Sequence, residues 1–341
     1  MQRCILILAA LAAAPAAAET FDVLYDQPSI DRWMYPFNAS PGTRPTFSVF
    51  GSDREVPTQF DARDGQIVLA FDTDLVIPPG RSANGYVVRG AEVTLQVANN
   101  LVFRLDTTAD AWTTFLPASD PRVTVDADAG QPVELFGVGF RGGFSETNFV
   151  ETAAYAQPGS SFISPGVRNA FAADVDASGA TRDVSNNPRQ GFQATPFAIG
   201  QVQGLASGAL VPQDAILRFE VQVADAGIQA YLRRGLDRGR LFLSVSALTL
   251  VQREAGEFPL FYSKENALVA FGLAQPPRLR LLVDTVSPCA STDLDCNGLV
   301  DTGDVAIALL DFGPCVACAS DVDGTGTVDF GDIALIMLDF G

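Results

Sequence analysis

The 341-residue chain contains no histidine. This absence excludes a histidine general base, a Ser–His or Cys–His nucleophilic pair, and any metal centre that depends on imidazole ligands. Chemistry based on carboxylates is still allowed. Basic residues are also scarce, because 22 Lys and Arg stand against 40 Asp and Glu, which gives a net charge of −18. Nucleic acids and anionic membrane surfaces would repel such a chain, so neither is expected as a partner.

The sequence has no apolar run long enough to cross a bilayer, so membrane insertion is not expected. A short apolar run, residues 4–13, follows Arg3 and precedes the small residues Ala16, Ala17 and Ala18. This order of a positive charge, an apolar core and small residues is typical of a secretory signal peptide. We therefore predict that residues 1–18 are a signal peptide and that the protein is secreted, either extracellular or at the cell surface.

Cysteine is confined to the end of the chain once the predicted signal peptide is set aside. The four remaining cysteines are Cys289, Cys296, Cys315 and Cys318. An even number of cysteines in an exported protein predicts two disulfides, for which three pairings are possible. The alternative is a zinc site with four thiolate ligands, because Cys315 and Cys318 form a C-x-x-C pair. An oxidising compartment favours the disulfides.

Residues 19–287 have the pattern of a β domain. Apolar and polar side chains alternate within residues 91–97, 215–223, 241–245 and 279–283. Such alternation turns one set of side chains inward and the other toward solvent, as in an antiparallel β-sandwich. The more continuous apolar run 67–71 predicts a central strand. The expected fold class is mainly β, an antiparallel, jelly-roll-like β-sandwich followed by a small helical C-terminal domain.

Two further segments stand out in this region. Asp225 is suited to cap a helix in which Ile228, Leu232 and Leu236 repeat at intervals of four before Gly239 ends it. We expect this helix to lie across one end of the sandwich. Between about residues 116 and 211 the alternation weakens into Gly, Ala, Ser, Asn and Asp with short strands, which indicates long loops or an insertion over one face.

Short segments of the large domain resemble a known family. Residues 261–266 (FYSKEN) and 277–281 (PRLRL) resemble the close of DNRLRE-type jelly-roll carbohydrate-binding domains, where a Ser-basic-Glu step leads into a final Pro-x-Leu strand. Residues 66–72 (QIVLAFD) resemble the early strand of the same family. The resemblance implies a jelly roll that binds a polysaccharide or another glycan.

The tail of the chain is acidic and repetitive. Residues 289–341 hold ten Asp and no Glu, Lys or Arg, so they carry −10 of the net charge of −18. Residues 293–312 and 321–340 repeat with a spacing of 28 residues. Each repeat opens with the pattern of a 12-residue calcium loop, which supplies oxygen ligands from positions 1, 3, 5, 7, 9 and 12. The tail is therefore expected to bind two Ca²⁺ ions, one in each loop.

The expected ligands follow from these positions, with position 7 contributing its backbone carbonyl. They are Asp293, Asp295, Asn297, Leu299, Asp301 and Asp304 in the first loop, and Asp321, Asp323, Thr325, Thr327, Asp329 and Asp332 in the second. Gly298 and Gly326 at position 6 permit the sharp turn that the loop requires. Val300 and Val328 at position 8 are expected to pair the loops through a short β contact.

With these motifs, residues 288–341 closely resemble a dockerin domain. Each loop ends in Asp at position 12, where an ordinary EF-hand has Glu, and each precedes a single apolar helix. The resemblance implies attachment to a cohesin-like protein or to a cell-surface matrix. Positions 10 and 11 are Thr302-Gly303 and Phe330-Gly331, where cellulosomal dockerins carry a Ser/Thr-type pair for cohesin contact, so the contact surface differs from theirs.

These observations favour a secreted, non-catalytic β-sandwich that binds a glycan or matrix and carries a calcium-binding tail. One alternative is a polysaccharide-degrading enzyme, a glycoside hydrolase or lyase, and another is a structural cell-surface protein. Acidic pairs that are candidates for calcium binding or glycosidase acids are Asp72/Asp74, Asp126/Asp128 and Asp174/Asp176. Aromatic residues that are candidates for stacking on sugar rings, or for the core, are Trp33, Tyr35, Tyr86 and Trp112.

Overall fold

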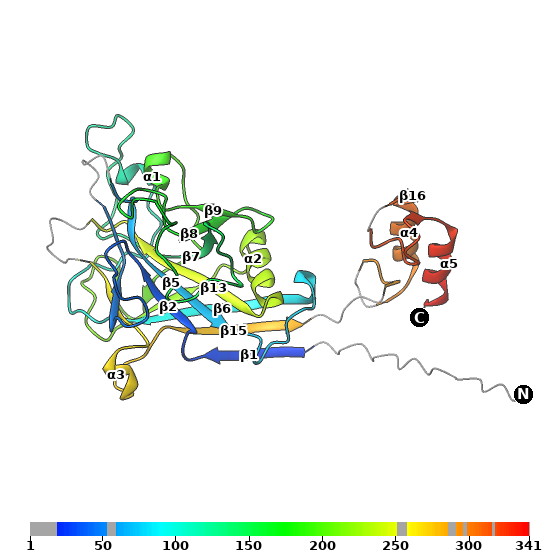
Figure 1. Ribbon diagram of the computed structural model, residues 1–341, viewed down its shortest axis with the longest axis horizontal. Helices are drawn as coiled ribbons and strands as arrows, with labels where there is room; N and C mark the ends of the chain where they lie inside the picture. The colour runs from blue at the N-terminus through cyan, green and yellow to red at the C-terminus, as the bar shows by residue number, and fades with distance from the viewer. Residues whose placement is uncertain are drawn as a thin grey trace, which may run out of the picture. The chain divides into compact units, whose positions relative to one another are not determined.

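A computed structural model of the chain describes residues 19–52, 59–250, 258–285, 291–295, 299–315 and 318–340. Contacts between residues divide the chain into two compact units, one of them Thr20–Asp284 and the other including Thr285–Gly341 (Figure 1). The predicted signal peptide lies outside the described residues. Within the described ranges, no helix combines the length and the apolar character that crossing a membrane requires.

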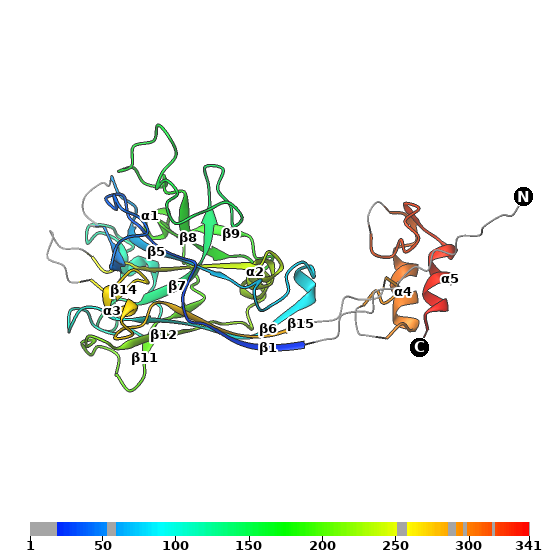
Figure 2. The same ribbon diagram turned by 60° about the horizontal axis from the view of Figure 1, so that its bottom comes forward.

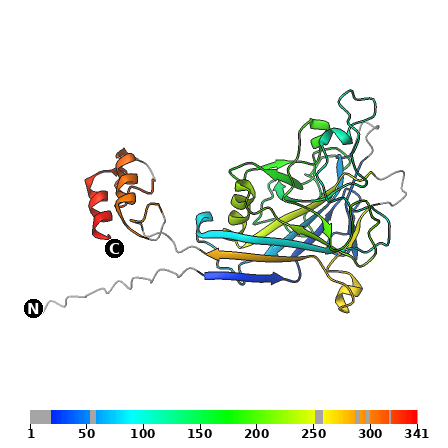
Figure 3. The ribbon, with the colours of Figure 1, turned by 180° about the vertical axis from the view of Figure 1, so that it is seen from behind.

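The large unit is mainly β, with antiparallel sheets, as predicted. The five-stranded sheet has the order β1 (Glu19–Tyr25), β15 (Arg278–Thr285), β6 (Tyr86–Gln96), β12 (Ile216–Glu220) and β11 (Gln201–Val202). Figures 2 and 3 show β1, β15 and β6 running side by side. The eight-stranded sheet has the order β2 (Ile30–Met34), β5 (Arg63–Asp72), β13 (Arg240–Ala247), β7 (Val133–Phe140), β8 (Ala170–Val175) and β9 (Thr181–Asp183), with β4 (Phe50–Gly51) on β5 and β10 (Ala198–Ile199) on β7.

Smaller elements complete this unit. They are the paired strands β3 (Thr46–Ser48) and β14 (Leu260–Tyr262), the short helices η1 (Ala83–Gly85), η2 (Trp112–Phe115), α1 (Asn187–Gln190) and α3 (Ala267–Ala270), and the longer helix α2 (Ala226–Asp237).

The main hydrophobic core draws its side chains from both large sheets. Leu69 of β5 and Leu243 of β13 belong to it together with Leu95 of β6 and Leu281 of β15, and all four are buried. The alternation that predicted strands at residues 91–97, 215–223 and 279–283 is explained by this core, because the apolar set of each strand faces it. On β15, for example, Leu279, Leu281 and Val283 are buried and the residues between them are not.

The expectation of one solvent-facing side is wrong for β13. Phe242, Ser244 and Ser246, which alternate with its core-facing residues, are buried as well. The strand lies between β5 and β7, and Phe242 packs on the opposite face against a second apolar cluster that includes Phe149. The central strand predicted at residues 67–71 is confirmed, because β5 lies between β2 and β13 and is buried almost throughout.

The predicted helix is confirmed as α2. The carboxylate of Asp225 accepts hydrogen bonds from the backbone N–H groups of Gly227 (2.9 Å) and Ile228 (3.0 Å), and so caps the helix. Ile228, Leu232 and Leu236 enter the main core. The helix contacts β6 of the five-stranded sheet and β13 of the eight-stranded sheet. Its apolar side therefore packs on the core that the two sheets share.

Short strands were expected between residues 116 and 211, but as part of loops or an insertion. That part of the prediction is wrong for β7 and β8, because both belong to the eight-stranded sheet. Their small residues have a packing role. A Cβ added to Gly139 would collide with the ring of Phe171, and one added to Gly137 would lie 3.0 Å from the rings of Phe197 and Tyr231. Aromatic rings thus lie directly on the strand backbone, and the glycines hide the strand pattern in the sequence.

The tail contains the predicted pair of helices, α4 (Thr302–Leu310) and α5 (Phe330–Leu338), which pack together. Ala308, Val328, Ile333 and Ile336 form its small core. The expected β contact between Val300 and Val328 is wrong. Strand β17 (Thr327–Val328) pairs with β16 (Gly313–Pro314), with Val328 opposite Gly313, while Val300 is a partly buried neighbour of the core.

Candidate metal centre

Each of the two tail loops gathers three carboxylates. Oxygens of Asp293, Asp295 and Asp304, at positions 1, 3 and 12, lie within 4.8 Å of one another. Oxygens of the corresponding residues of the second loop, Asp321, Asp323 and Asp332, are equally close. Calcium binds oxygen at about 2.3–2.6 Å, so two ligands of one ion are at most about 5 Å apart. The carboxylates therefore fit a calcium ion in both loops.

The residue at position 12 lies in the first turn of the helix, and its carboxylate reaches back to the loop. One oxygen of Asp304 accepts hydrogen bonds from the backbone N–H groups of Leu294 (2.6 Å) and Asp295 (3.1 Å), which form the beginning of the loop. Its other oxygen accepts from the N–H of Asp301 (2.8 Å). The Asp301 carboxylate in turn accepts from the N–H of Asp304, which completes a capping box, and also from the N–H of Gly303 (2.6 Å). Asp304 thus ties the loop to the helix.

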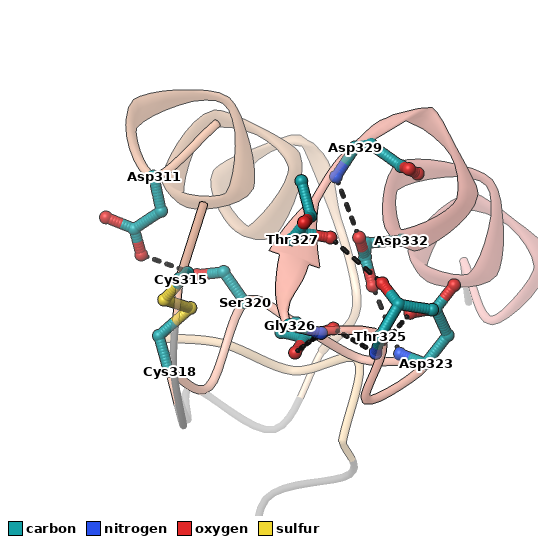
Figure 4. The surroundings of a disulfide bond; sticks show 11 residues. Asp311, Cys315, Cys318, Ser320, Asp323, Thr325, Gly326, Thr327, Asp329 and Asp332 are labelled. Atoms are coloured by element: carbon teal, nitrogen blue, oxygen red, sulfur yellow. Dashed lines mark hydrogen bonds between the residues drawn. A yellow bond between two sulfur atoms is a disulfide. The ribbon is translucent and has the colours of Figure 1, made fainter. Parts of the chain in front are cut away.

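The second loop repeats this arrangement, and its turn is visible in Figure 4. Asp332 accepts from the N–H groups of Asp323 (3.1 Å) and Asp329 (2.8 Å). Asp321 accepts from the N–H groups of Thr325 (2.9 Å) and Gly326 (2.8 Å). Gly326 has a φ of 83°, which a residue with a side chain rarely adopts, so glycine at position 6 is explained by the backbone turn.

Glycine at position 11 of each loop lies close to two of the expected ligands, which the sequence did not indicate. A Cβ on Gly303 would lie 3.0 Å from an oxygen of Asp301 and 3.2 Å from one of Asp295, and Gly331 has the same neighbours in the second loop. A side chain at this position would press on two of the expected ligands.

Hydrogen bonding keeps the carboxylates at position 12 ionised. Burial acts to raise the pKa of Asp304, but backbone N–H donors from Asp301, Asp295 and Leu294 outweigh it, and the pKa is lowered from its usual value. The pKa of Asp332 is lowered for the same reason, by donors that include Asp329 and Asp323. Both groups are therefore anionic at neutral pH, as a calcium ligand must be.

The remaining expected ligands are those at positions 5, 7 and 9 of each loop. Asp301 and Asp329, at position 9, are the N-caps of α4 and α5. The backbone carbonyl of Thr327 accepts a hydrogen bond from the hydroxyl of Thr325 (3.2 Å). Leu299 has an exposed side chain, and Asn297 lies outside the described residues. The structure thus brings together positions 1, 3 and 12 in each loop, with position 9 at the adjoining helix start.

A reciprocal pair of hydrogen bonds links the two repeats, and sequence reasoning missed it. The Thr292 hydroxyl donates to Asp339 (2.7 Å), and the Ser320 hydroxyl donates to Asp311 (2.6 Å). Each hydroxyl immediately precedes one loop, and each Asp immediately follows the helix of the other repeat. Asp311 and Asp339 are equivalent positions within the repeats, and Thr292 and Ser320 extend each repeat by one residue at its start. A comparison of the repeats that began one residue earlier would have shown this pairing of a hydroxyl with an Asp.

The tail also contains a disulfide between Cys315 and Cys318. It takes up two of the thiols that the alternative zinc site would need. Cys289 and Cys296 lie outside the described residues, so the second predicted disulfide stays a prediction.

The acidic pairs of the large unit are less suited to acid–base catalysis than the sequence suggests. Asp72 forms an ion pair with Arg240, and Asp174 forms one with Arg182 (2.6 Å). Asp176 accepts hydrogen bonds within its own turn.

Asp126 and Asp128 lie near two further carboxylates, those of Asp106 and Asp110. Desolvation, followed by the charges of Asp106, Asp126 and Asp128, raises the pKa of Asp110 to about 7. Within the part of the chain that the structure describes, no Lys or Arg forms an ion pair with these carboxylates, in contrast to Asp72 and Asp174.

The candidate aromatic residues divide between core and surface. Tyr86 is buried in the main core. Trp33 stacks on Tyr35 with ring centroids 4.6 Å apart, and Phe37 meets Phe162 at 5.8 Å. Phe37 and Phe162 are half exposed, at 52% and 50%.

Trp112 lies apart from this group, and the Arg122 guanidinium covers its ring at 5.2 Å. Trp33 is partly buried against the main core, and the Arg44 guanidinium lies 4.8 Å over its ring. The surface aromatic group therefore consists of Phe37 and Phe162.

Two buried ionic groups were not predicted from the sequence. The fully buried Arg168 donates to Asp61 (2.7 Å), with Asp64 beside it at 3.9 Å. Lys264, the single lysine of the chain, lies 2.7 Å from Glu151 and 3.3 Å from Asp31. Neither group has a pattern in the sequence, because its members come from distant segments.

Comparison with known proteins adds no relative. No family model, no curated protein and no solved structure matches this chain.

Proposed function

We propose that this protein is exported and non-catalytic, that its tail folds around two calcium ions and attaches it to a partner, and that its large unit binds a glycan. The observation that carries the calcium proposal is the repeated geometry of the tail. Two clusters of three carboxylates, each at the start of a capped helix, recur at equivalent positions 28 residues apart. Without a cation, the charges within each cluster repel one another.

Attachment is supported by the surface of the tail. Leu310 is 86% exposed, Phe330 75% and Leu338 79%, and all three belong to α4 or α5. Large apolar side chains gathered on so small a module favour contact with another protein. Together with the resemblance to dockerins, this favours a cohesin-like protein as the partner.

Calcium binding by the tail is tested in the full-length chain by isothermal titration calorimetry and far-ultraviolet circular dichroism. Replacing both Asp293 and Asp321 by Ala removes position 1 from each loop and should lower the number of bound ions by two, with loss of the calcium-induced helical signal. The matched control replaces Asp311 and Asp339 by Asn, which removes two charges outside the loops and keeps their acceptor oxygens. An unchanged number of ions in D293A/D321A would refute the proposal.

Glycan binding is supported by the surface aromatic group, because exposed aromatic faces can stack on sugar rings. The jelly-roll resemblance favours the same function, and the shared core of the two sheets is compatible with a β-sandwich. The polysaccharide-degrading alternative has less support, because Asp72 and Asp174 are engaged by arginines.

A glycan array should show binding by the full-length chain, and Phe37→Ala combined with Phe162→Ala should abolish it. Phe271→Ala is the matched control, since Phe271 is 77% exposed and lies just after α3. The same glycans should yield no new reducing ends. Release of reducing sugar would support the enzyme instead, and equal binding by the F37A/F162A variant would exclude this surface.

A further inference from the structure

The described part of the large unit holds two further clusters of carboxylates, one of which surrounds Lys264. The other has no lysine in it. Asp106, Asp110 and Asp128 each offer an oxygen, and these oxygens lie within 4.8 Å of one another. Asp106 and Asp110 lie between β6 and η2, and Asp128 belongs to the segment that precedes β7. The cluster therefore joins two separate stretches of the chain.

The two stretches are packed closely at this point. Gly130 has a φ of 123°, and a Cβ added to it would lie 3.1 Å from the backbone oxygen of Arg104 and 3.1 Å from the Cβ of Asp106. Glycine is favoured here both by this close approach and by the positive φ, which residues with a side chain rarely adopt. The hydroxyl of Thr108 lies 2.9 Å from Asp106 and 2.8 Å from Asp128, so it bridges the carboxylates of the two stretches.

One carboxylate oxygen of the cluster is buried and has no partner. The Asp106 side chain accepts hydrogen bonds at one oxygen, but its other oxygen, Oδ2, has no hydrogen-bond partner among the described residues. Asp106 is only 2% exposed. Within the described part of the chain, no Lys or Arg forms an ion pair with Asp106, Asp110 or Asp128. A buried anionic oxygen without a donor is costly, and a bound cation would remove that cost.

We propose that Asp106, Asp110 and Asp128 bind one divalent cation in the large unit, independently of the tail loops. The ligands are all oxygen, which suits hard cations such as calcium, magnesium and manganese and excludes a preference for soft ones. Calcium is the cation that we assign, because its flexible coordination accepts carboxylates from two separate stretches of chain, whereas magnesium demands near-ideal octahedral geometry.

The position of Trp112 gives this site its own spectroscopic probe. Trp112 follows Asp110 by two residues, whereas residues 288–341 contain neither Trp nor Tyr. Terbium(III) is a hard cation that replaces calcium at oxygen sites and luminesces when a nearby indole is excited. Terbium luminescence excited through tryptophan should therefore report the large unit and not the tail loops.

The test uses the full-length chain with Asp293→Ala and Asp321→Ala, so that the tail loops do not compete. Terbium should give saturable luminescence that excess calcium displaces, and calorimetry with calcium alone should find one site. Adding Asp106→Asn, Asp110→Asn and Asp128→Asn should remove both results, whereas the control Asp22→Asn with Asp284→Asn, two carboxylates paired with exposed arginines, should keep them. Trp112→Phe should remove the luminescence and keep the calorimetric site.

Two outcomes would overturn the proposal. One is luminescence and calcium binding that persist in the triple Asn variant. The other is a tail-disabled chain that binds no calcium and whose melting temperature calcium does not raise. The second outcome does not depend on the triple variant, so the proposal stays testable even where that variant fails to fold.

Discussion

At the scale of single residues, the most informative feature of the large unit is the unequal sharing of Arg168 between two acids. Asp61 has the close ion pair with Arg168 and further accepts from Gly166 (2.7 Å) and Asn186 (2.5 Å). Asp64 is left with one buried oxygen that has no hydrogen-bond partner among the described residues. Burial raises the pKa of Asp64 to about 7; Arg168 opposes this effect and the charge of Asp61 adds to it.

This pKa predicts a pH dependence of stability. Because the folded chain holds the Asp64 proton up to about pH 7 and the unfolded chain releases it near pH 4, the stabilising contribution is complete below pH 4 and is lost as the pH rises through 7. Relative to the Asp64→Asn variant, the wild type should lose about 1.4 kcal/mol of unfolding free energy per pH unit in this window. Urea unfolding in saturating calcium measures the unfolding free energy of the wild type and of the variant from pH 4 to 8. If the two free energies change equally with pH over this range, the assignment is contradicted.

At the scale of elements, helix α2 depends on the cap that Asp225 provides at its start. The Asp225 carboxylate satisfies two backbone N–H groups at the start of the helix. Asp225→Ala leaves them without a side-chain partner and should cost about 1 kcal/mol in unfolding free energy, whereas Asp225→Ser keeps an acceptor and should cost less. The midpoint of urea unfolding measures the difference. Equal midpoints for the two variants would show that the cap does not stabilise the large unit.

Elements were predictable from the sequence where local chemistry determines them. Asp225 and the spacing of Ile228, Leu232 and Leu236 predicted α2, and the tail loops predicted the two short helices after them. The sequence could not show that Phe242 and Ser244 are buried, because that depends on the neighbours of β13 in the sheet. Of the acidic group around Asp106, the sequence indicated only the pair Asp126/Asp128. Asp106 and Asp110 could not be assigned to the same group, because only the fold brings their stretch of chain next to Asp128.

At the scale of the whole molecule, the large unit has a complete core of its own. Every member of the main apolar cluster lies between Phe47 and Val283, inside the unit Thr20–Asp284. A chain shortened after Ser287 should therefore unfold cooperatively, with a melting temperature within about 2 °C of the corresponding transition of the full chain. Circular dichroism and calorimetry measure both.

The contrasting control for that experiment is a chain shortened after Pro277. It lacks β15, which lies between β1 and β6 and supplies Leu279, Leu281 and Val283 to the core. It should be insoluble or lack a cooperative transition. If the chain that ends at Ser287 behaves in the same way, the tail is needed for folding and the division into two units is wrong.

The reciprocal pair of Thr292 with Asp339 and Ser320 with Asp311 has a consequence for how the tail responds to calcium. Each bond connects the entrance of one loop to the end of the other repeat's helix, so an ion that orders one loop also fixes an anchor of the other. The two sites are then coupled, and the coupling must act equally in both directions. Where both loops bind calcium as proposed, they should therefore fill together over a narrow range of calcium concentration, and the proposed attachment should follow the same range.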